Sequence, residues 1–315
     1  MNRPVRQLGA LVLAAALVVG AIVIRQRIDG NGQPSSDGGS GAAITLVCDP
    51  LMADACKGVP NASVTVEGPA VTAERLIARE PLGADAWVTS DLWTSIAADR
   101  LSGSAWLADG AKVLGAANPI LVGQAARLDP LAAHCGADPL TWRCVGDNAG
   151  KTWSDVGVPN LNSKIDIGYP LATTTIGLAD VTAIVSSYFK GTDFATNDLD
   201  DDDFRSWYSR LQSAVADHGS ASQTPLQRFL QVPATYGVVG DLSTSKPSIS
   251  AIAAAATLSV VDSTPAIRVR AVIVSPTRTD LPTDRLSELL RPTWNADSDT
   301  GSLPAGGVLS ALSEL

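Results

Sequence analysis

The segment that most constrains the fold lies near the middle of the chain, at Tyr169-Pro-Leu-Ala-Thr-Thr-Thr-Ile-Gly177. An extended run ends there in three threonines and a glycine, and an apolar pattern with helical spacing begins at Leu178. The pattern is typical of a strand that enters the N-terminus of a helix. Helix N-termini carry unpaired N–H donors and a partial positive charge, so this junction suits a polar or anionic ligand.

Two similar strand-to-helix junctions occur earlier in the chain, at 67–72 and 88–91. Ligands of open α/β sheets bind outside the carboxyl ends of the strands, where such junctions fall. The recurrence therefore predicts a ligand cleft, although any one junction alone is equally well explained as an ordinary helix cap. The residues that the junctions place in the cleft are Thr72, Ser90, Asp91, Thr173, Thr174, Thr175 and Gly177. For Asp91, capping its own helix is the favoured alternative.

Strands and helices alternate from residue 43 to residue 100. We expect strands at 43–48, 63–67 and 84–89, with helices at 71–79 and 92–100. This order predicts βαβ units and a mainly parallel sheet, hence an α/β fold.

The remainder of the chain predicts a second set of elements. The extended run 112–123, broken by Asn118-Pro119, is suited to cross from one lobe to another, and the strand 266–275 is suited to return. The stretch 126–163 is expected to be rich in loops. Further strands are expected at 165–169 and 234–240, and helices at 178–189, 204–217, 225–231, 252–258, 283–290 and 306–315.

Four segments of this order resemble a known family: 44–49, 84–91, 113–122 and 165–177. They resemble the type 2 periplasmic solute-binding proteins of ABC transporters. The Ala-Asn-Pro-Ile-Leu-Val run looks like the crossover of molybdate- and sulfate-binding proteins, and 168–177 looks like their second-lobe ligand motif. The N-terminus is similar to that of an actinobacterial type with a membrane anchor.

The resemblance implies a bilobal fold, with two mainly parallel sheets and flanking helices joined by two crossover strands. Lobe 1 would comprise 42–118 and 266–315, and lobe 2 would comprise 119–265. Asn118, at the crossover, joins the predicted ligand-binding residues. The family binds small molecules by closing its lobes around them, and works with a membrane transporter as partner.

An apolar run of 17 uncharged residues, 8–24, lies close to the start of the chain. It is flanked by Arg3 and Arg6 on one side and by Arg25 and Arg27 on the other. Residues 1–28 are therefore predicted to be a signal peptide or a signal anchor, and the Gly/Ser/Asp-rich stretch 29–41 a flexible linker. We expect a single-pass membrane protein with an extracytoplasmic domain, or a secreted protein if the segment is cleaved.

The four cysteines form two close couples, Cys48 with Cys56 and Cys135 with Cys144. An even number behind an export signal indicates disulfides, and four cysteines allow three pairings. Proximity along the chain favours the two local pairs. Zinc binding is the alternative, but the spacing C-x-x-C is missing and only His134 is nearby.

Composition argues against several other function classes. The net charge of −9 and the lack of a dense basic cluster disfavour a nucleic-acid partner. With two histidines, His134 and His218, the sequence offers little material for acid–base or metal catalysis. The run Ser243-Thr-Ser-Lys246 matches the S-x-x-K signature of serine acyl-enzymes, although it precedes a proline and lacks a K-T-G partner.

The aspartates of 198–203 could ligate calcium, but the run is better explained as the acidic start of a helix.

The sequence therefore predicts a binding protein without catalytic activity, cofactor or metal. It would hold a small polar or anionic ligand, such as an oxyanion, between two lobes for transport or sensing. The alternative is a ligand-free scaffold with the same fold that binds a membrane protein partner in the cell envelope.

Overall fold

The computed structural model describes residues 43–102, 104–137, 139–220, 223–252, 255–296 and 301–315. Ala43–Leu315 forms one compact unit built around two five-stranded sheets. The predicted anchor and linker, 1–28 and 29–41, lie outside the described residues. In the described ranges, no helix combines the length and apolar character required to span a membrane.

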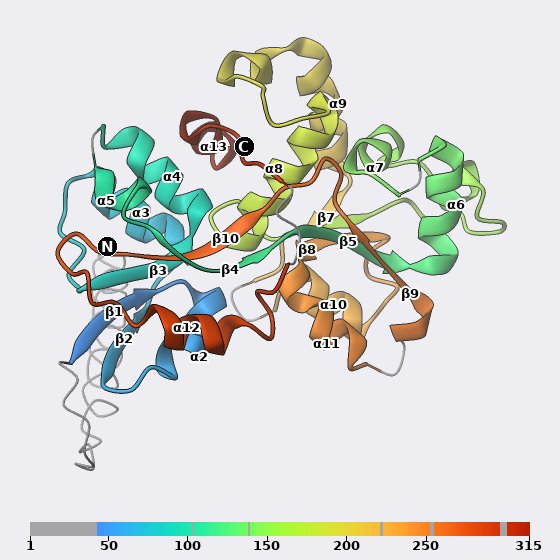
Figure 1. Cartoon of the computed structure of the whole chain (residues 1–315). Helices are drawn as coiled ribbons and strands as arrows, with labels where there is room; N and C mark the ends of the chain where they lie inside the picture. Colours follow the sequence, from blue (N-terminus) through green and yellow to red (C-terminus); the bar gives the residue numbers. More distant parts are fainter. Residues whose placement is uncertain (1–42, 103, 138, 221–222, 253–254, 297–300) are drawn as a thin grey trace, which may run out of the picture. The chain divides into compact units, whose positions relative to one another are not determined.

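The first sheet is built from strands at both ends of the folded unit. Its order is β2 (Ala62–Val66), β1 (Ile44–Cys48), β3 (Ala86–Ser90), β10 (Val269–Val274) and β4 (Lys112–Ala117). Helices α3 (Pro69–Ile77), α4 (Asp91–Arg100) and α5 (Ala105–Ala108) lie on one side of this sheet, and α2 (Ala53–Lys57) and α12 (Thr283–Leu290) lie on the other (Figure 1).

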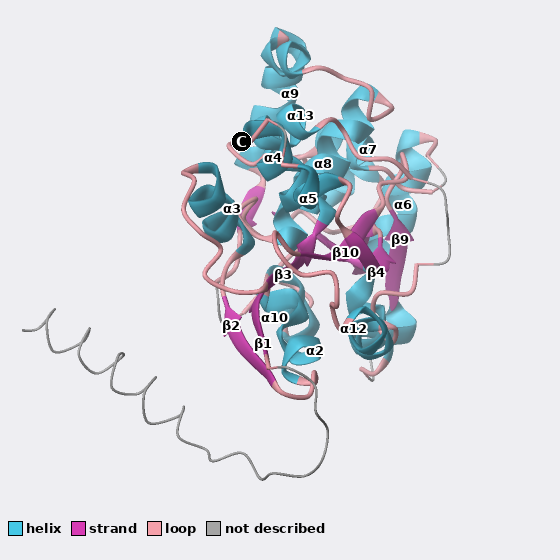
Figure 2. Cartoon of the chain, turned by 60° about the vertical axis from the view of Figure 1, so that its left-hand side comes forward, coloured by secondary structure: helices cyan, strands magenta, loops and turns pink. Residues whose placement is uncertain are grey.

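The second sheet is built from the middle of the chain. Its order is β7 (Val215–Asp217), β6 (Ile167–Gly168), β8 (Val238–Leu242), β5 (Pro119–Gln124) and β9 (Leu258–Asp262). Helices α6 (Ala125–Cys135), α7 (Trp142–Asn148), α8 (Thr175–Phe189) and α9 (Asp202–Ser213) lie on one side (Figure 1). Helices α10 (Pro225–Gln231) and α11 (Lys246–Ser250) lie on the other. Figure 2 shows helices on both sides of the strands.

Two connections join the sheets, as the sequence predicted. Asn118 separates β4 in the first sheet from β5 in the second, and the chain returns from β9 to β10. Both sheets are mixed: β1 pairs in parallel with β2 and β3, whereas β10 is antiparallel to β3 and β4. In the second sheet β6 is parallel to β7 and β8, and β5 is antiparallel to β8 and β9. The antiparallel ladders therefore belong to the crossover strands β5 and β10.

Most predicted elements of the first sheet are present within two residues of their expected bounds, but three predictions for the second half of the fold were wrong. The stretch 126–163, expected to be rich in loops, contains the helices α6 and α7. Helix α6 was not expected because Pro130 lies inside it, and proline is disfavoured in the interior of a helix. Val215–Asp217, expected as the end of a helix, is the edge strand β7. The expected helix 252–258 is wrong because Leu258 begins β9, which pairs with β5.

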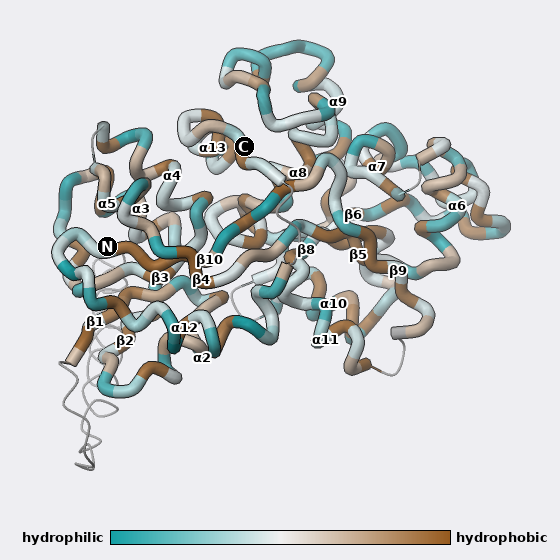
Figure 3. The backbone as a smooth tube through the Cα atoms, viewed as in Figure 1, coloured by the Kyte–Doolittle hydropathy of each residue, from teal (hydrophilic) through white to brown (hydrophobic). Residues whose placement is uncertain are grey.

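The hydrophobic core follows the strands and the helices packed on them. Figure 3 shows the strands β3 and β5 as mostly hydrophobic. All residues of β3 are buried, and α8 is buried along nearly its whole length. The two predicted disulfides, Cys48–Cys56 and Cys135–Cys144, are both formed. Each closes a local loop next to a core element, which confirms the pairing inferred from proximity.

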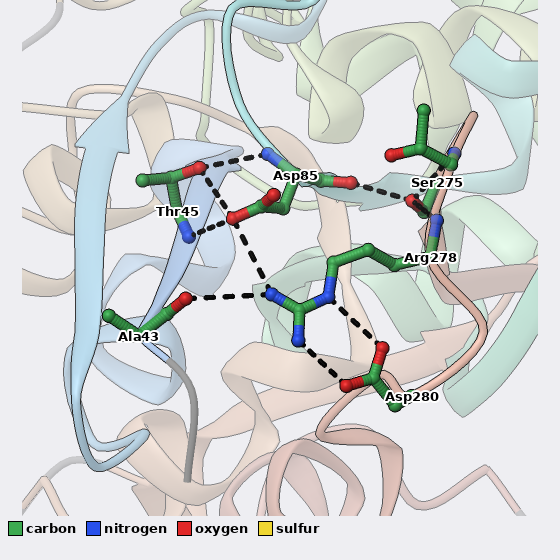
Figure 4. Close-up of polar contacts among 7 residues, drawn as sticks. Ala43, Thr45, Asp85, Ser275, Arg278 and Asp280 are labelled. Atoms are coloured by element: carbon green, nitrogen blue, oxygen red, sulfur yellow. Dashed lines mark hydrogen bonds and ion pairs between the residues drawn. The ribbon is translucent and has the colours of Figure 1, made fainter.

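A polar network ties the start of β1 to the chain that follows β10 (Figure 4). Asp85 accepts hydrogen bonds from the backbone N–H and the hydroxyl of Thr45, at 2.7 and 2.8 Å. Ser275 donates to the carbonyl of Asp85 at 2.6 Å, and Arg278 forms an ion pair with Asp280. The hydrogen bonds from Thr45 keep the pKa of Asp85 below its usual value. Because Thr45 lies near the start of β1 and Asp85 directly precedes β3, the network lies at the opposite ends of these strands from the predicted cleft residues.

Candidate functional site: a buried contact between the two sheets

The predicted junction is the N-terminus of helix α8. Thr174 is the N-cap residue, and its hydroxyl accepts a hydrogen bond from the N–H of Gly177 at 3.1 Å. The helix begins at Thr175, three residues before the predicted start, because the cap supplies the partner that the first turn needs. Gly177 is required by close packing, since a Cβ atom there would lie 2.0 Å from the carbonyl oxygen of Leu171.

Thr175, the first residue of α8, forms hydrogen bonds with residues of the first sheet. Its hydroxyl donates to Oδ2 of Asp49 at 2.5 Å, and its oxygen lies 3.2 Å from the hydroxyl of Ser90. A threonine hydroxyl carries one hydrogen, which goes to Asp49, so Ser90 is the donor in the second bond. Thr175, Asp49 and Ser90 are 1%, 2% and 0% exposed. These three side chains, which we call the inter-sheet contact, therefore bind one another away from solvent.

Asp49 was not among the predicted site residues. It directly follows β1 and its backbone N–H donates to the carbonyl of Val88 on the parallel neighbour β3. Oδ1 of Asp49 accepts from the N–H of Leu51 at 2.9 Å, which caps the short turn Pro50–Met52. Burial raises the pKa of Asp49 to about 6, against the lowering effect of the hydrogen bonds from Thr175 and Leu51. Its position at a strand end beside Ser90 was the sequence signal that could have identified it.

The other predicted site residues are engaged elsewhere. Thr72 is fully buried and its hydroxyl donates to Glu67 at 2.6 Å, within its own strand-to-helix junction. The backbone N–H of Asn118 donates to the hydroxyl of Ser243 at 3.0 Å, which ties the crossover to the end of β8. Thr173 and Thr174 are exposed. Of the eight predicted residues, Thr174 and Gly177 hydrogen-bond within the start of α8, and Ser90 and Thr175 hydrogen-bond between the first sheet and α8.

Asp91 begins α4, one residue after Ser90 in the inter-sheet contact. Its Oδ1 accepts a hydrogen bond from the backbone N–H of Arg270 on β10 at 2.9 Å. Burial raises the pKa of Asp91 to about 7, and the hydrogen bond and charge of Arg270 act against this shift. The residue lines a pocket of about 550 Å³ between α4, α5, β10 and the segment 301–306.

Two further buried carboxyl groups belong to Asp180 on α8 and Asp241 on β8. Asp180 on α8 is 0% exposed, and among the described residues neither of its carboxyl oxygens has a hydrogen-bond partner. Burial and the nearby charge of Asp241 raise its pKa well above the usual value. Asp241 accepts from the hydroxyl of Ser245 and the N–H of Leu242, and burial raises its pKa to about 6. Burial of both side chains therefore disfavours the charged form of Asp180.

The C-terminal segment adds further contacts between the two halves. Helix α13 (Gly306–Leu312) packs on α4, beside the first sheet, and on α8, beside the second. The hydroxyl of Ser302, which precedes this helix, lies 2.6 Å from that of Thr192, which follows α8. The inter-sheet contact is therefore reinforced from the side of the C-terminus.

The residues that the sequence offered for acyl-enzyme chemistry and for metal binding make other contacts in the structure. Ser243 accepts from the backbone of Asn118, and Lys246 forms an ion pair with Asp262 at 2.8 Å, so the two do not act on each other. Asp201 caps α9, which agrees with an acidic helix start. Within the described ranges, no group of three or more histidine, cysteine, aspartate or glutamate side chains is placed to hold a metal ion.

No protein-family model matches the sequence, and no curated protein matches it. Solved structures do match. An ABC transporter protein of Clostridium perfringens superposes with a TM-score of 0.54 at 9% identity, over 86% of this chain and 96% of its own. Iron-bound HitA from Pseudomonas aeruginosa gives 0.53 at 12% identity, over 87% and 97%. A ferric binding protein from Campylobacter jejuni gives 0.52 at 9%, over 86% and 95%.

At sequence identities of 9 to 12%, the similarity to these structures concerns the fold. The similar structures are an ABC transporter protein, an iron-bound protein and a ferric binding protein. The two helix-flanked sheets and the paired crossovers agree with their architecture. The described part of this chain therefore has the bilobal α/β fold of the periplasmic binding proteins.

Proposed function

We propose that this chain is an extracytoplasmic solute-binding protein that holds a small polar or anionic ligand between its two lobes. The observation that supports this proposal is the carboxyl group of Asp49 at the N-terminus of α8. A helix N-terminus that already accommodates a carboxyl group between the sheets offers the donors that a ligand carboxylate or oxyanion needs. In this interpretation Asp49 takes the ligand's place when no ligand is bound.

The proposed mechanism is an exchange at the inter-sheet contact. The lobes, 42–118 with 266–315 and 119–265, would open about the crossover strands β4–β5 and β9–β10. A ligand would replace Asp49 as the acceptor of the Thr175 hydroxyl. We propose that 1–28 anchors the protein to the membrane, that a membrane transporter or receptor is its partner, and that it performs no chemistry. Sulfate- and molybdate-type oxyanions belong to the ligands to be tested.

Calorimetric titration of the full-length chain tests this proposal. The probes are sulfate, molybdate, phosphate, amino acids and sugars, added to wild type and to the Asp49→Ala and Thr175→Val variants. We expect one anionic probe to bind wild type, to bind Asp49→Ala more tightly because its competitor is removed, and to lose affinity for Thr175→Val. The control is Thr65→Val, which removes an exposed hydroxyl on β2, away from the N-terminus of α8. Absence of binding by every probe to wild type and to Asp49→Ala would contradict the proposal.

A ligand-free scaffold is the second candidate, and the burial of the inter-sheet contact favours it. Three polar side chains hydrogen-bond directly to one another with 2% exposure or less. A protein whose lobes are held in this way, with further contacts through α13, could present a fixed surface to an envelope partner. Small-angle scattering distinguishes the candidates: a scaffold keeps the same radius of gyration in wild type and in the presence of every probe, whereas a solute-binding protein contracts with its ligand.

A further inference from the structure

A pocket of about 550 Å³ lies beside the first sheet, outside the inter-sheet contact. Its walls come from α4, α5 and the segment 301–306, and its floor comes from the paired strands β4 and β10. The volume falls in the range of small-molecule sites, roughly 300 to 1,000 Å³. Neither Ser90 nor Thr175 lines it, so this pocket is separate from the site of the proposed function.

Charged side chains of both signs line the pocket. Arg270 lies on β10 and Arg268 directly precedes that strand. Asp91 begins α4 and Asp109 follows α5. Arg270 is exposed, and its backbone N–H holds the carboxyl group of Asp91. A guanidinium group suits a ligand carboxylate, and a carboxylate suits a ligand ammonium group. With two groups of each sign, the lining is complementary to a molecule that itself carries both charges.

The floor and one wall of the pocket are apolar. Val113 on β4 is 54% exposed although it sits in a strand of the core sheet, and Leu107 and Leu303 line the same space. Val113 is therefore a large apolar side chain left open beside charged groups. An aliphatic group of a ligand would cover Val113 and remove its surface from water.

We propose that this pocket binds a small zwitterion with an apolar body, its carboxylate at Arg270 and its ammonium group at Asp91. The apolar body lies against Val113. Such a ligand has the chemistry of an amino acid with an aliphatic side chain, and L-leucine is the probe that we use. The proposal does not rest on the solute-binding function of the lobes, because none of the residues of the inter-sheet contact takes part.

Calorimetric titration of the full-length chain with L-leucine tests the site. We expect saturable binding with a Kd below about 1 mM. L-leucinol lacks the carboxylate and 4-methylpentanoate lacks the ammonium group, so each should bind about tenfold more weakly, as expected for the loss of one charged hydrogen bond. Arg270→Gln should weaken L-leucine about tenfold while leaving L-leucinol unchanged. Val113→Phe should weaken all three by filling the floor.

The controls separate this site from the inter-sheet contact. Arg285→Gln alters an exposed arginine of α12, which pairs with Glu288, and should leave L-leucine binding unchanged. Thr175→Val should also leave it unchanged. The proposal is overturned if wild type shows no saturable binding, if Arg270→Gln and Val113→Phe bind L-leucine as wild type does, or if Thr175→Val alone abolishes binding. The melting temperature of each variant shows that a loss of binding is not a loss of folding.

Discussion

Asp180 on α8 faces Gly240 on β8, one residue before the buried carboxyl group of Asp241. A Cβ atom at position 240 would lie 2.8 Å from the carboxyl carbon of Asp180, so only glycine leaves room for that side chain. Both carboxyl groups are buried, and the charge of Asp241 contributes to the raised pKa of Asp180. The helix that carries Thr175 is thus packed through a buried carboxyl group whose oxygens lack hydrogen-bond partners among the described residues.

Asp180→Asn should stabilise the protein at pH 7.5. An asparagine of nearly the same shape removes a carboxyl group whose charged form is disfavoured by burial in the folded chain but not in the unfolded chain. We expect the free energy of unfolding in urea to rise, and the gain to shrink towards pH 4, where the carboxyl group of the unfolded chain is also protonated. Asp129→Asn, an exposed position on α6, is the control and should change stability little. A destabilised Asp180→Asn protein at pH 7.5 would contradict this account.

The stability of wild type should fall as the pH rises from about 4 to about 7. The buried carboxyl groups of Asp49 and Asp241 and the half-buried one of Asp91 have folded-state pKa values raised by desolvation from 3.8 to about 6, 6 and 7. Above pH 4 the unfolded chain loses these protons while the folded chain keeps them, so stability is present at low pH and lost through the folded pKa values. A shift of two units corresponds to roughly 3 kcal/mol. Urea unfolding at pH 4.5, 6.0 and 7.5 measures the trend, and a free energy that rises with pH would be inconsistent with it.

Gly177→Ala should be strongly destabilising. A Cβ atom would lie 2.0 Å from the carbonyl oxygen of Leu171, and backbone cannot move aside as a flexible side chain can. We expect a loss of about 3 kcal/mol or more in the free energy of unfolding, at the upper end for overpacking. Gly191→Ala is the matched control: nothing lies within 4 Å of a Cβ there, and it should cost less than about 0.5 kcal/mol. Equal stability of the two variants would refute the close packing of the junction.

The disulfide Cys48–Cys56 should matter for the inter-sheet contact, because Asp49 is the residue next to it. Replacing both cysteines by serine should lower stability by about 2–3 kcal/mol, as expected for a short loop. Replacing Cys135 and Cys144 should cost a similar amount. Amide hydrogen exchange distinguishes the two double variants. The exchange rate in the first turn of α8 should rise in the variant without Cys48–Cys56 and stay unchanged in the variant without Cys135–Cys144. Equal acceleration in both would show that the Cys48–Cys56 loop does not position Asp49.

The sequence predicted the first sheet better than the second for a physical reason. Strands β1, β2 and β3 are short runs rich in β-branched and apolar residues, each followed by a helical segment, and their bounds follow from that local pattern. In the second sheet, β7 is three residues long and β6 is two residues long. They are strands because β6 forms backbone pairs with both β7 and β8. Such pairing between distant segments leaves no periodicity in the chain.

The site could be predicted in part. The junction at Thr173–Gly177 identified the correct helix N-terminus, because capping is a local property of the sequence. Asp49 as the partner of Thr175 could not be found in this way, since 126 residues separate them and the contact depends on how the two sheets meet. The buried pair Asp180 and Asp241 was missed because an aspartate in sequence is expected to be exposed.

A double-mutant cycle between Asp49 and Thr175 tests the central claim most directly. Asp49→Ala, Thr175→Val and their combination are compared with wild type by urea unfolding at pH 7.5. If the hydroxyl of Thr175 binds the carboxyl group of Asp49 between the sheets, the two substitutions should be non-additive by about 1–2 kcal/mol. The combination of Asp49→Ala with Thr65→Val, an exposed position on β2, should be additive. A coupling energy near zero for Asp49 and Thr175 would contradict the inter-sheet contact and the function proposed from it.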